Sequence, residues 1–268
     1  MRLNFFTVLA AIALTGGTAT AQPAPQAQVF ANGVAVLKAK LGPQKEFREP
    51  PAATDAEAAR AWANVRSSMA VFGTPAFPVR DYETFEAVCG PLNEMSVQIA
   101  MAGAGGGKLA ALKDKPDEGM KQLRTLMQAN NVKHQDVLLM LASSNVKCMA
   151  LHLPFFERFW DSLPADQKTP VRADGLRQMR TGAANMLTGI AINGVDPQMK
   201  LANRTIAIQA AAAYAPAYAR TMSLVQRKAL MQTLSKSAPG LAARYPQEYK
   251  AIARALSDQT CVALCVIP

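Results

Sequence analysis

Residues 137–153 have the sequence VLLMLASSNVKCMALHL, and this stretch decides the fold class. Its apolar side chains do not alternate as they would in a half-buried strand, and they occupy most of the circumference of a helix. A helix on the surface of a globular protein carries a polar face, whereas a helix that is apolar on nearly all sides is buried. We therefore predict that residues 137–153 form a central, buried helix.

Helical spacing continues on both sides of this segment. After Pro154, the side chains of Phe156, Phe159, Trp160 and Leu163 follow at i, i+3, i+4 and i+7, which is one face of a helix that Pro164 should close. No run of alternating β-branched residues between hairpin turns is present in the sequence. We predict an all-α fold, an irregular bundle of roughly seven or eight helices.

The N-terminus has the three-part order of a cleavable signal peptide. Arg2 precedes an apolar run over residues 3–14, and small residues follow, ending in Ala19-Thr20-Ala21. The apolar run is too short for a transmembrane helix, which needs about 20 residues. We expect residues 1–21 to be removed, leaving a soluble periplasmic or secreted protein without a transmembrane anchor.

The mature chain divides into two parts by composition. Residues 22–53 are rich in Pro, Ala and Gln and are predicted to form a flexible leader. Residues 54–268 are predicted to form a single helical domain, a length that suits one hydrophobic core.

Four cysteines, Cys89, Cys148, Cys261 and Cys265, are an even number, and an exported chain meets an oxidising compartment. We therefore expect two disulfides rather than four buried thiols. Three pairings are open from sequence alone. We favour Cys89 with Cys148 and Cys261 with Cys265, because an irregular tail can close the small loop between the last two.

Positive charge is concentrated in the C-terminal third. The chain has 29 Lys and Arg against 19 Asp and Glu, a formal net charge of +10. Residues 197–247 contain no Asp or Glu, and Lys228, Gln232 and Lys236 recur at every fourth position, which forms a helical stripe. We hypothesise that Arg227, Lys228 and Lys236 contact an anionic envelope surface or an acidic protein.

Two other interpretations of this charge stay open. It can serve solubility alone, or pair internally with Glu83, Glu86 and Glu94, which share one broad face of a predicted helical region. Nucleic acid is not the expected partner, because the segment lacks recognition motifs and interleaved aromatic residues.

No catalytic motif is present. The segment at residues 102–109, AGAGGGKL, departs from a phosphate-binding loop because Leu109 stands where Ser or Thr is required. The two histidines, His134 and His152, lack the spacing of metal ligands, so we predict no metal site and no cofactor. We favour a non-enzymatic binding or adaptor protein of the cell envelope, and a structural component of the envelope is a third interpretation.

The alternative is a helical enzyme or small-ligand binder. Asn145 and His152 lie on one stripe of the predicted central helix, seven residues apart. Buried polar side chains need hydrogen-bond partners, and a site can supply them as well as a core can. This hypothesis places Asn145 and His152 at the wall of a pocket.

Overall fold

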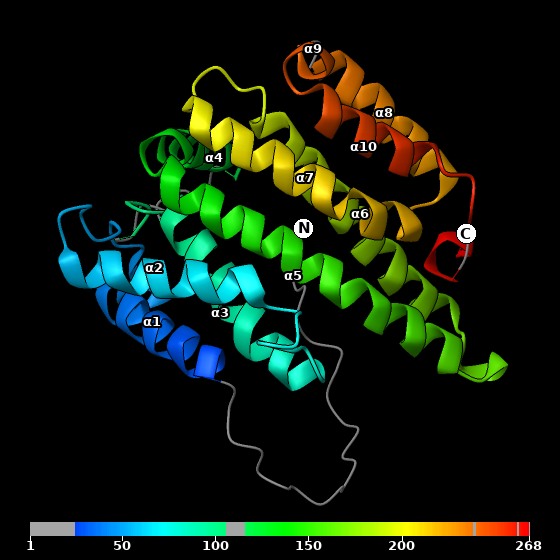
Figure 1. Ribbon diagram of the computed structural model, residues 1–268, viewed down its shortest axis with the longest axis horizontal. Helices are drawn as coiled ribbons and strands as arrows, with labels where there is room; N and C mark the ends of the chain where they lie inside the picture. Colours follow the sequence, from blue (N-terminus) through cyan, green and yellow to red (C-terminus); the bar gives the residue numbers. More distant parts are fainter. Residues whose placement is uncertain (1–24, 106–115, 238–239, 262, 268) are drawn as a thin grey trace, which may run out of the picture.

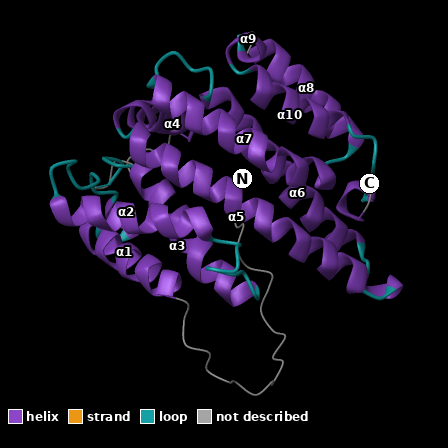
Figure 2. Ribbon diagram, viewed as in Figure 1, coloured by secondary structure: helices purple, strands orange, loops and turns teal. Residues whose placement is uncertain are grey.

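The computed structural model describes residues 25–105, 116–237, 240–261 and 263–267. In these ranges it contains ten α-helices and no β-strand (Figure 2), which confirms the all-α prediction. The helices are α1 (Pro25–Leu41), α2 (Ala56–Val71), α3 (Tyr82–Ala100), α4 (Pro116–Lys133), α5 (Gln135–Ser162), α6 (Pro170–Asn193), α7 (Leu201–Thr221), α8 (Leu224–Ser237), α9 (Leu241–Arg244) and α10 (Pro246–Ser257).

Helix α5 runs through the middle of the bundle, with α1–α3 on one side and α6–α10 on the other (Figure 1). Leu138, Leu141 and Cys148 on one face of α5 belong to the core that α1–α3 form. Val146 and Leu153 on another face belong to the core of α6–α10. A helix between two cores needs apolar residues around most of its circumference, which is what the sequence of residues 137–153 has.

The core of the second half is built around α7. Its residues Ala207, Ala211, Ala215 and Ala219, four apart, are all buried. Residues four apart lie on one helix face, so this stripe of methyl groups lets α7 pack closely against neighbouring helices. The hydroxyl of Tyr218 donates to the carbonyl of Val146 at 3.0 Å and so connects α7 to α5 inside the core.

The structure differs from the prediction of a flexible leader over residues 22–53. Residues 25–41 form α1, which packs along α2. The physical reason is an apolar stripe, Phe30, Val34, Leu37 and Leu41, whose side chains are all buried. The prediction rested on the Pro, Ala and Gln content of this segment, and composition does not report the helical spacing of its apolar residues.

Three prolines lie inside helices without ending them: Pro91 in α3, Pro154 in α5 and Pro216 in α7. The sequence predicted a new segment after Pro154, whereas α5 continues to Ser162. A proline inside a helix removes one backbone hydrogen bond. Contacts on both sides of α5 compensate for this loss, because Leu153 and Glu157, which flank Pro154, are buried.

Two disulfides cross-link the chain with the pairing favoured from sequence. Cys89 of α3 is bonded to Cys148 of α5, so this bridge lies within the first core. Cys261 is bonded to Cys265 and closes a small loop after α10. Cys265 itself lies in a short 3-10 helix, Ala263–Val266, which lies beside α5 and α7.

Two sequence predictions fall wholly or partly outside the described residues. These are the signal peptide, residues 1–21, and the second half, residues 106–109, of the glycine-rich segment at residues 102–109. Within the described ranges, α5 is the one helix long and apolar enough to cross a membrane. Half of its most apolar stretch is buried inside the bundle, as in the core helix of a soluble protein.

Candidate functional site

His152, one of the two predicted pocket residues, lies in a cluster of aromatic rings between α3 and α5. Its ring centroid is 4.0 Å from that of Phe85, with the rings stacked, and 4.2 Å from that of Phe156. Burial lowers the pKa of His152 to about 4, so the imidazole is neutral at pH 7. Its surroundings are apolar, and its ring packs as one member of the aromatic cluster.

Asn145, the other predicted pocket residue, is half-buried two turns earlier on α5. Neither Asn145 nor His152 lines either of the two cavities described below. Their polar neighbour Lys147 extends from α5 to the end of α2, where its Nζ donates to the carbonyls of Met69 at 2.8 Å and Ala70 at 3.0 Å. The Lys147 contact is structural, because it satisfies carbonyls that the end of a helix leaves free.

The three glutamates of the predicted acidic face line one cavity of about 440 Å³ on α3. Glu94 is paired with Lys38 of α1 at 2.6 Å, and Glu86 accepts a hydrogen bond from the hydroxyl of Tyr82 at 3.3 Å. These contacts are local to the first half of the bundle. The basic C-terminal segment finds its internal partners elsewhere.

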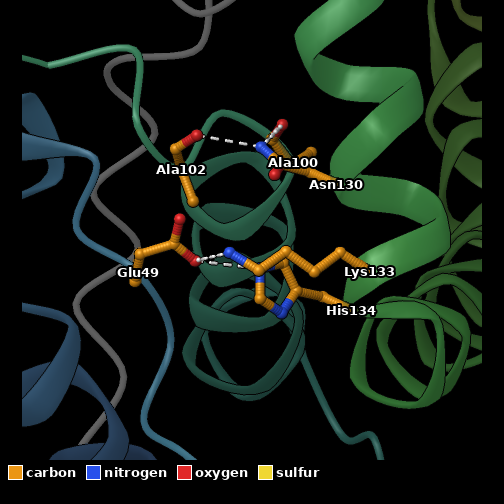
Figure 3. Close-up of polar contacts among 6 residues, drawn as sticks. All are labelled: Glu49, Ala100, Ala102, Asn130, Lys133 and His134. Carbon is orange, nitrogen blue, oxygen red and sulfur yellow. Dashed lines mark hydrogen bonds and ion pairs between the residues drawn. The ribbon is translucent and has the colours of Figure 1, made fainter.

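The second histidine, His134, belongs to a polar junction where α4 meets α5 (Figure 3). The Nε2 atom of His134 and the Nζ atom of Lys133 both contact Oε2 of Glu49, at 3.0 Å and 2.9 Å. The hydrogen bond from Lys133 is the main reason that the pKa of Glu49 is lowered. Beside them, the buried amide of Asn130 donates to two backbone carbonyls at the end of α3, that of its last residue, Ala100, and that of Ala102.

This junction fastens the loop before α2 to the end of α3 and the start of α5. Its partners are satisfied by one another, so it is a structural fastening and offers no open coordination position. No group of three or more His, Cys, Asp or Glu residues in the described ranges is placed to hold a metal ion.

Two cations of the acid-free segment are neutralised by α5. Lys200 pairs with Asp136 at the start of α5, and this contact is the first cause of the lowered pKa of Asp136. Arg220 pairs with the buried carboxylate of Glu157 at 3.0 Å. Internal pairing, one of the open interpretations, therefore accounts for part of the charge, with α5 acids as partners instead of Glu83, Glu86 and Glu94.

The three residues predicted to form the partner surface do not lie together. Lys228 and Lys236 are exposed on α8, whereas Arg227 is 2% exposed. The Arg227 guanidinium donates to the carbonyls of Met222, Asp258 and Thr260. It thereby joins the end of α7 to the segment that follows α10, so the prediction of Arg227 as a surface residue beside Lys228 needs correction.

Arg227 forms part of the wall of a groove of about 1360 Å³ between α7, α8 and α10. Four cationic side chains line this groove and one carboxylate does, that of Asp258. Small apolar residues make up much of the remaining wall. The lining residues are Pro216, Ala219, Arg220, Arg227, Pro246, Gln247, Lys250, Ala251, Arg254, Ala255, Ser257, Asp258 and Thr260.

Comparisons with protein-family models, curated proteins and solved structures give no significant match to this chain. Its function therefore has to be argued from its own residues. The groove is larger than the cavity on α3 and has an excess of positive charge, which makes it the candidate functional site.

The sequence analysis did not identify two cationic residues that line this groove, Lys250 and Arg254 of α10. They lie just outside the acid-free segment, between Glu248 and Asp258. The two acids offset the two cations when charges are counted along the chain, so this stretch shows no excess of positive charge. The four-residue spacing of Lys250 and Arg254 was the available signal, because it places both on one helix face.

Sequence reasoning also missed Arg180 of α6. This buried side chain donates to the carbonyls of Leu264 at 2.9 Å and Ile267 at 2.8 Å. Arg180 and Arg227 together hold the C-terminal tail through its backbone. Backbone carbonyls are common to all residue types, so no sequence pattern marks these contacts in advance.

Proposed function

We propose that this chain is an exported, non-enzymatic binding protein that holds an anionic partner at the basic surface of its C-terminal helices. The observation that carries the proposal is the lining of the groove between α7, α8 and α10, with four cations and one carboxylate. A concave surface on which one sign of charge predominates focuses the electrostatic field and attracts ligands of the opposite sign. Of the four cations, Arg220 is paired with Glu157, so Arg227, Lys250 and Arg254 supply the excess.

The charge around the groove favours the same partner. The exposed lysines Lys228 and Lys236 lie on α8, one of the helices that form the groove. The whole chain has a formal net charge of +10, which steers anionic partners from a distance. The groove would then give a local site to a partner that the net charge has attracted.

Export is the part of the proposal that rests on the sequence of residues 1–21, with its short apolar run and its Ala19-Thr20-Ala21 site. The two disulfides support it, because disulfides persist in oxidising compartments and are rare in the cytosol. The partner would accordingly be a component of the cell envelope or of the exterior.

Retention on heparin–agarose in a salt gradient tests the binding surface, because heparin is a sulfated polyanion that needs no knowledge of the natural partner. Three charge-reversed variants would be compared with the mature chain. They are Lys250→Glu/Arg254→Glu in the groove, Lys228→Glu/Lys236→Glu on α8, and Lys121→Glu/Arg124→Glu on the exposed face of α4 as the control. Each pair changes the net charge by the same amount.

We expect the two C-terminal variants to elute at lower salt than the α4 control, because local contacts to the anion are lost in addition to net charge. Equal shifts for all three variants would mean that retention follows net charge alone. That result would overturn the proposed surface.

A further inference from the structure

The two long walls of the groove differ in chemistry. The α10 wall carries Lys250 and Arg254, both exposed and both lining the groove. The α7 wall carries Pro216 and Ala219, which are small and apolar. The one cation of the α7 wall, Arg220, is already paired with Glu157 of α5.

The cations on α10 are the uncompensated ones. Within the described part of the chain, neither Lys250 nor Arg254 has an ion-pair partner. They are four residues apart on one helix, where two like charges repel each other. An anion bound between them would relieve this repulsion, so the α10 wall is arranged to accept negative groups in a row.

The spacing of this row matches one kind of anionic ligand. A helix rises about 1.5 Å per residue, so Lys250 and Arg254 are separated by about 6 Å along the axis of α10. In an extended peptide, alternate side chains point the same way and are about 6.6 to 6.8 Å apart. Acidic side chains at every second position would therefore meet Lys250 and Arg254 in turn.

The intervening side chains of such a peptide would point the opposite way, toward α7. Of the two apolar residues on that wall, Pro216 is exposed and suits small or β-branched apolar side chains, whereas Ala219 is buried in the core. The polar residues Gln247, Ser257 and Thr260 also line the groove and offer hydrogen-bonding groups to a peptide backbone. The volume of about 1360 Å³ exceeds the range of about 300–1000 Å³ that is usual for small-molecule sites.

We propose that the groove between α7 and α10 binds an extended peptide segment of a partner protein in which acidic residues alternate with apolar ones. Lys250 and Arg254 bind the carboxylates, and Pro216 contacts an apolar side chain. This inference rests on the proposed function and names the partner of the same site.

Fluorescence anisotropy with labelled peptides tests it, at about 150 mM salt, where long-range attraction is screened beyond about 8 Å. The probe is an eight-residue peptide in which Glu and Val alternate, since Val favours the extended form. The control peptide has the same composition in two blocks, four Glu followed by four Val. The proteins are the full mature chain, Lys250→Glu/Arg254→Glu, and Lys121→Glu/Arg124→Glu on α4 as the matched control.

We expect the alternating peptide to bind the mature chain and the α4 control, and to bind the groove variant at least about tenfold more weakly, the factor that one lost charge-assisted hydrogen bond gives. The block peptide should bind about tenfold more weakly than the alternating one. Its first and third Glu can meet Lys250 and Arg254, but its second and fourth Glu point toward the apolar wall of α7, where the alternating peptide places Val. Circular dichroism would verify that both variants fold, and both carry only exposed substitutions.

Equal binding of the two peptides would overturn the alternating pattern. Heparin retention that depends on Lys250 and Arg254, together with no peptide binding, would overturn this inference and leave the proposed function standing. If neither heparin nor peptide depended on the C-terminal residues, both would fail.

Discussion

Removing the disulfide between Cys89 and Cys148 is expected to destabilise the protein about twice as much as removing the one between Cys261 and Cys265. The first bridge spans 59 residues and the second spans 4. A cross-link stabilises by reducing the entropy of the unfolded chain, and the loop-length relation gives about 4 kcal/mol for the long loop and about 2 kcal/mol for the short one at 25 °C.

Thermal unfolding followed by circular dichroism would measure both losses, with the double variants Cys89→Ala/Cys148→Ala and Cys261→Ala/Cys265→Ala. For a chain of this size, each kcal/mol shifts the melting temperature by about 2–4 °C. We therefore expect decreases of about 8–16 °C for the core pair and about 4–8 °C for the tail pair.

Deletion of the sulfur atoms is a separate effect, because Cys89 and Cys148 are buried and alanine leaves a small cavity. Repeating each measurement in a reductant isolates this effect, since wild type and variants then both lack the cross-links. A tail variant as destabilised as the core variant, after this correction, would refute the argument from loop length.

Three further changes test other parts of the structure. Arg227→Met is expected to lower the free energy of unfolding by about 3 kcal/mol in urea titrations, because three carbonyls lose a charged donor. Lys228→Met, on the exposed face of α8, should change it by less than about 0.5 kcal/mol. Similar losses for the two variants would contradict the buried position of Arg227. Burial lowers the pKa of His152 to about 4 from its ordinary value near 6.5, so the unfolded chain takes up a proton first as the pH falls, and stability should drop by up to about 3 kcal/mol between pH 6.5 and 4. His152→Phe should show a smaller drop over that range in the same titrations, and an unchanged drop would show that other groups cause it. Gly33→Ala should destabilise the protein, since the new Cβ would lie 2.9 Å from a backbone oxygen of α2. Gly182→Ala has open space around the new Cβ and should stabilise the protein by about 0.5–1 kcal/mol. Thermal melts with the opposite order would contradict this packing.

The sequence predicted the fold class and the central helix because both depend on local patterns. Residues 137–153 are apolar around the helix, and that property alone requires burial on several sides. The extent of α5 was not predictable in the same way. A proline ends most helices, and Pro154 is retained in α5 only because tertiary contacts on either side of it offset the lost hydrogen bond.

The candidate site was predictable in its charge and not in its residues. The acid-free segment indicated a basic C-terminal half, yet Lys200 and Arg220 from that segment pair with acids of α5. Charged residues are mostly exposed, so nothing in the sequence predicted that Arg227 would be buried. Its partners Asp258 and Thr260 lie more than thirty residues further along the chain.

The contacts of Arg227 explain why the groove can be a preformed site. Its guanidinium holds Met222, just after α7, and Asp258, just after α10, so it fixes the distance between the ends of the two helices that form the groove. Arg180 in the same way holds the tail on both sides of Cys265, through the carbonyls of Leu264 and Ile267. A binding site whose walls are already fixed loses little conformational entropy when a ligand enters, and more of the interaction energy then contributes to affinity. Arg227 thus holds the walls of the proposed site in place, while Lys250 and Arg254 are exposed along it, where a ligand would meet them.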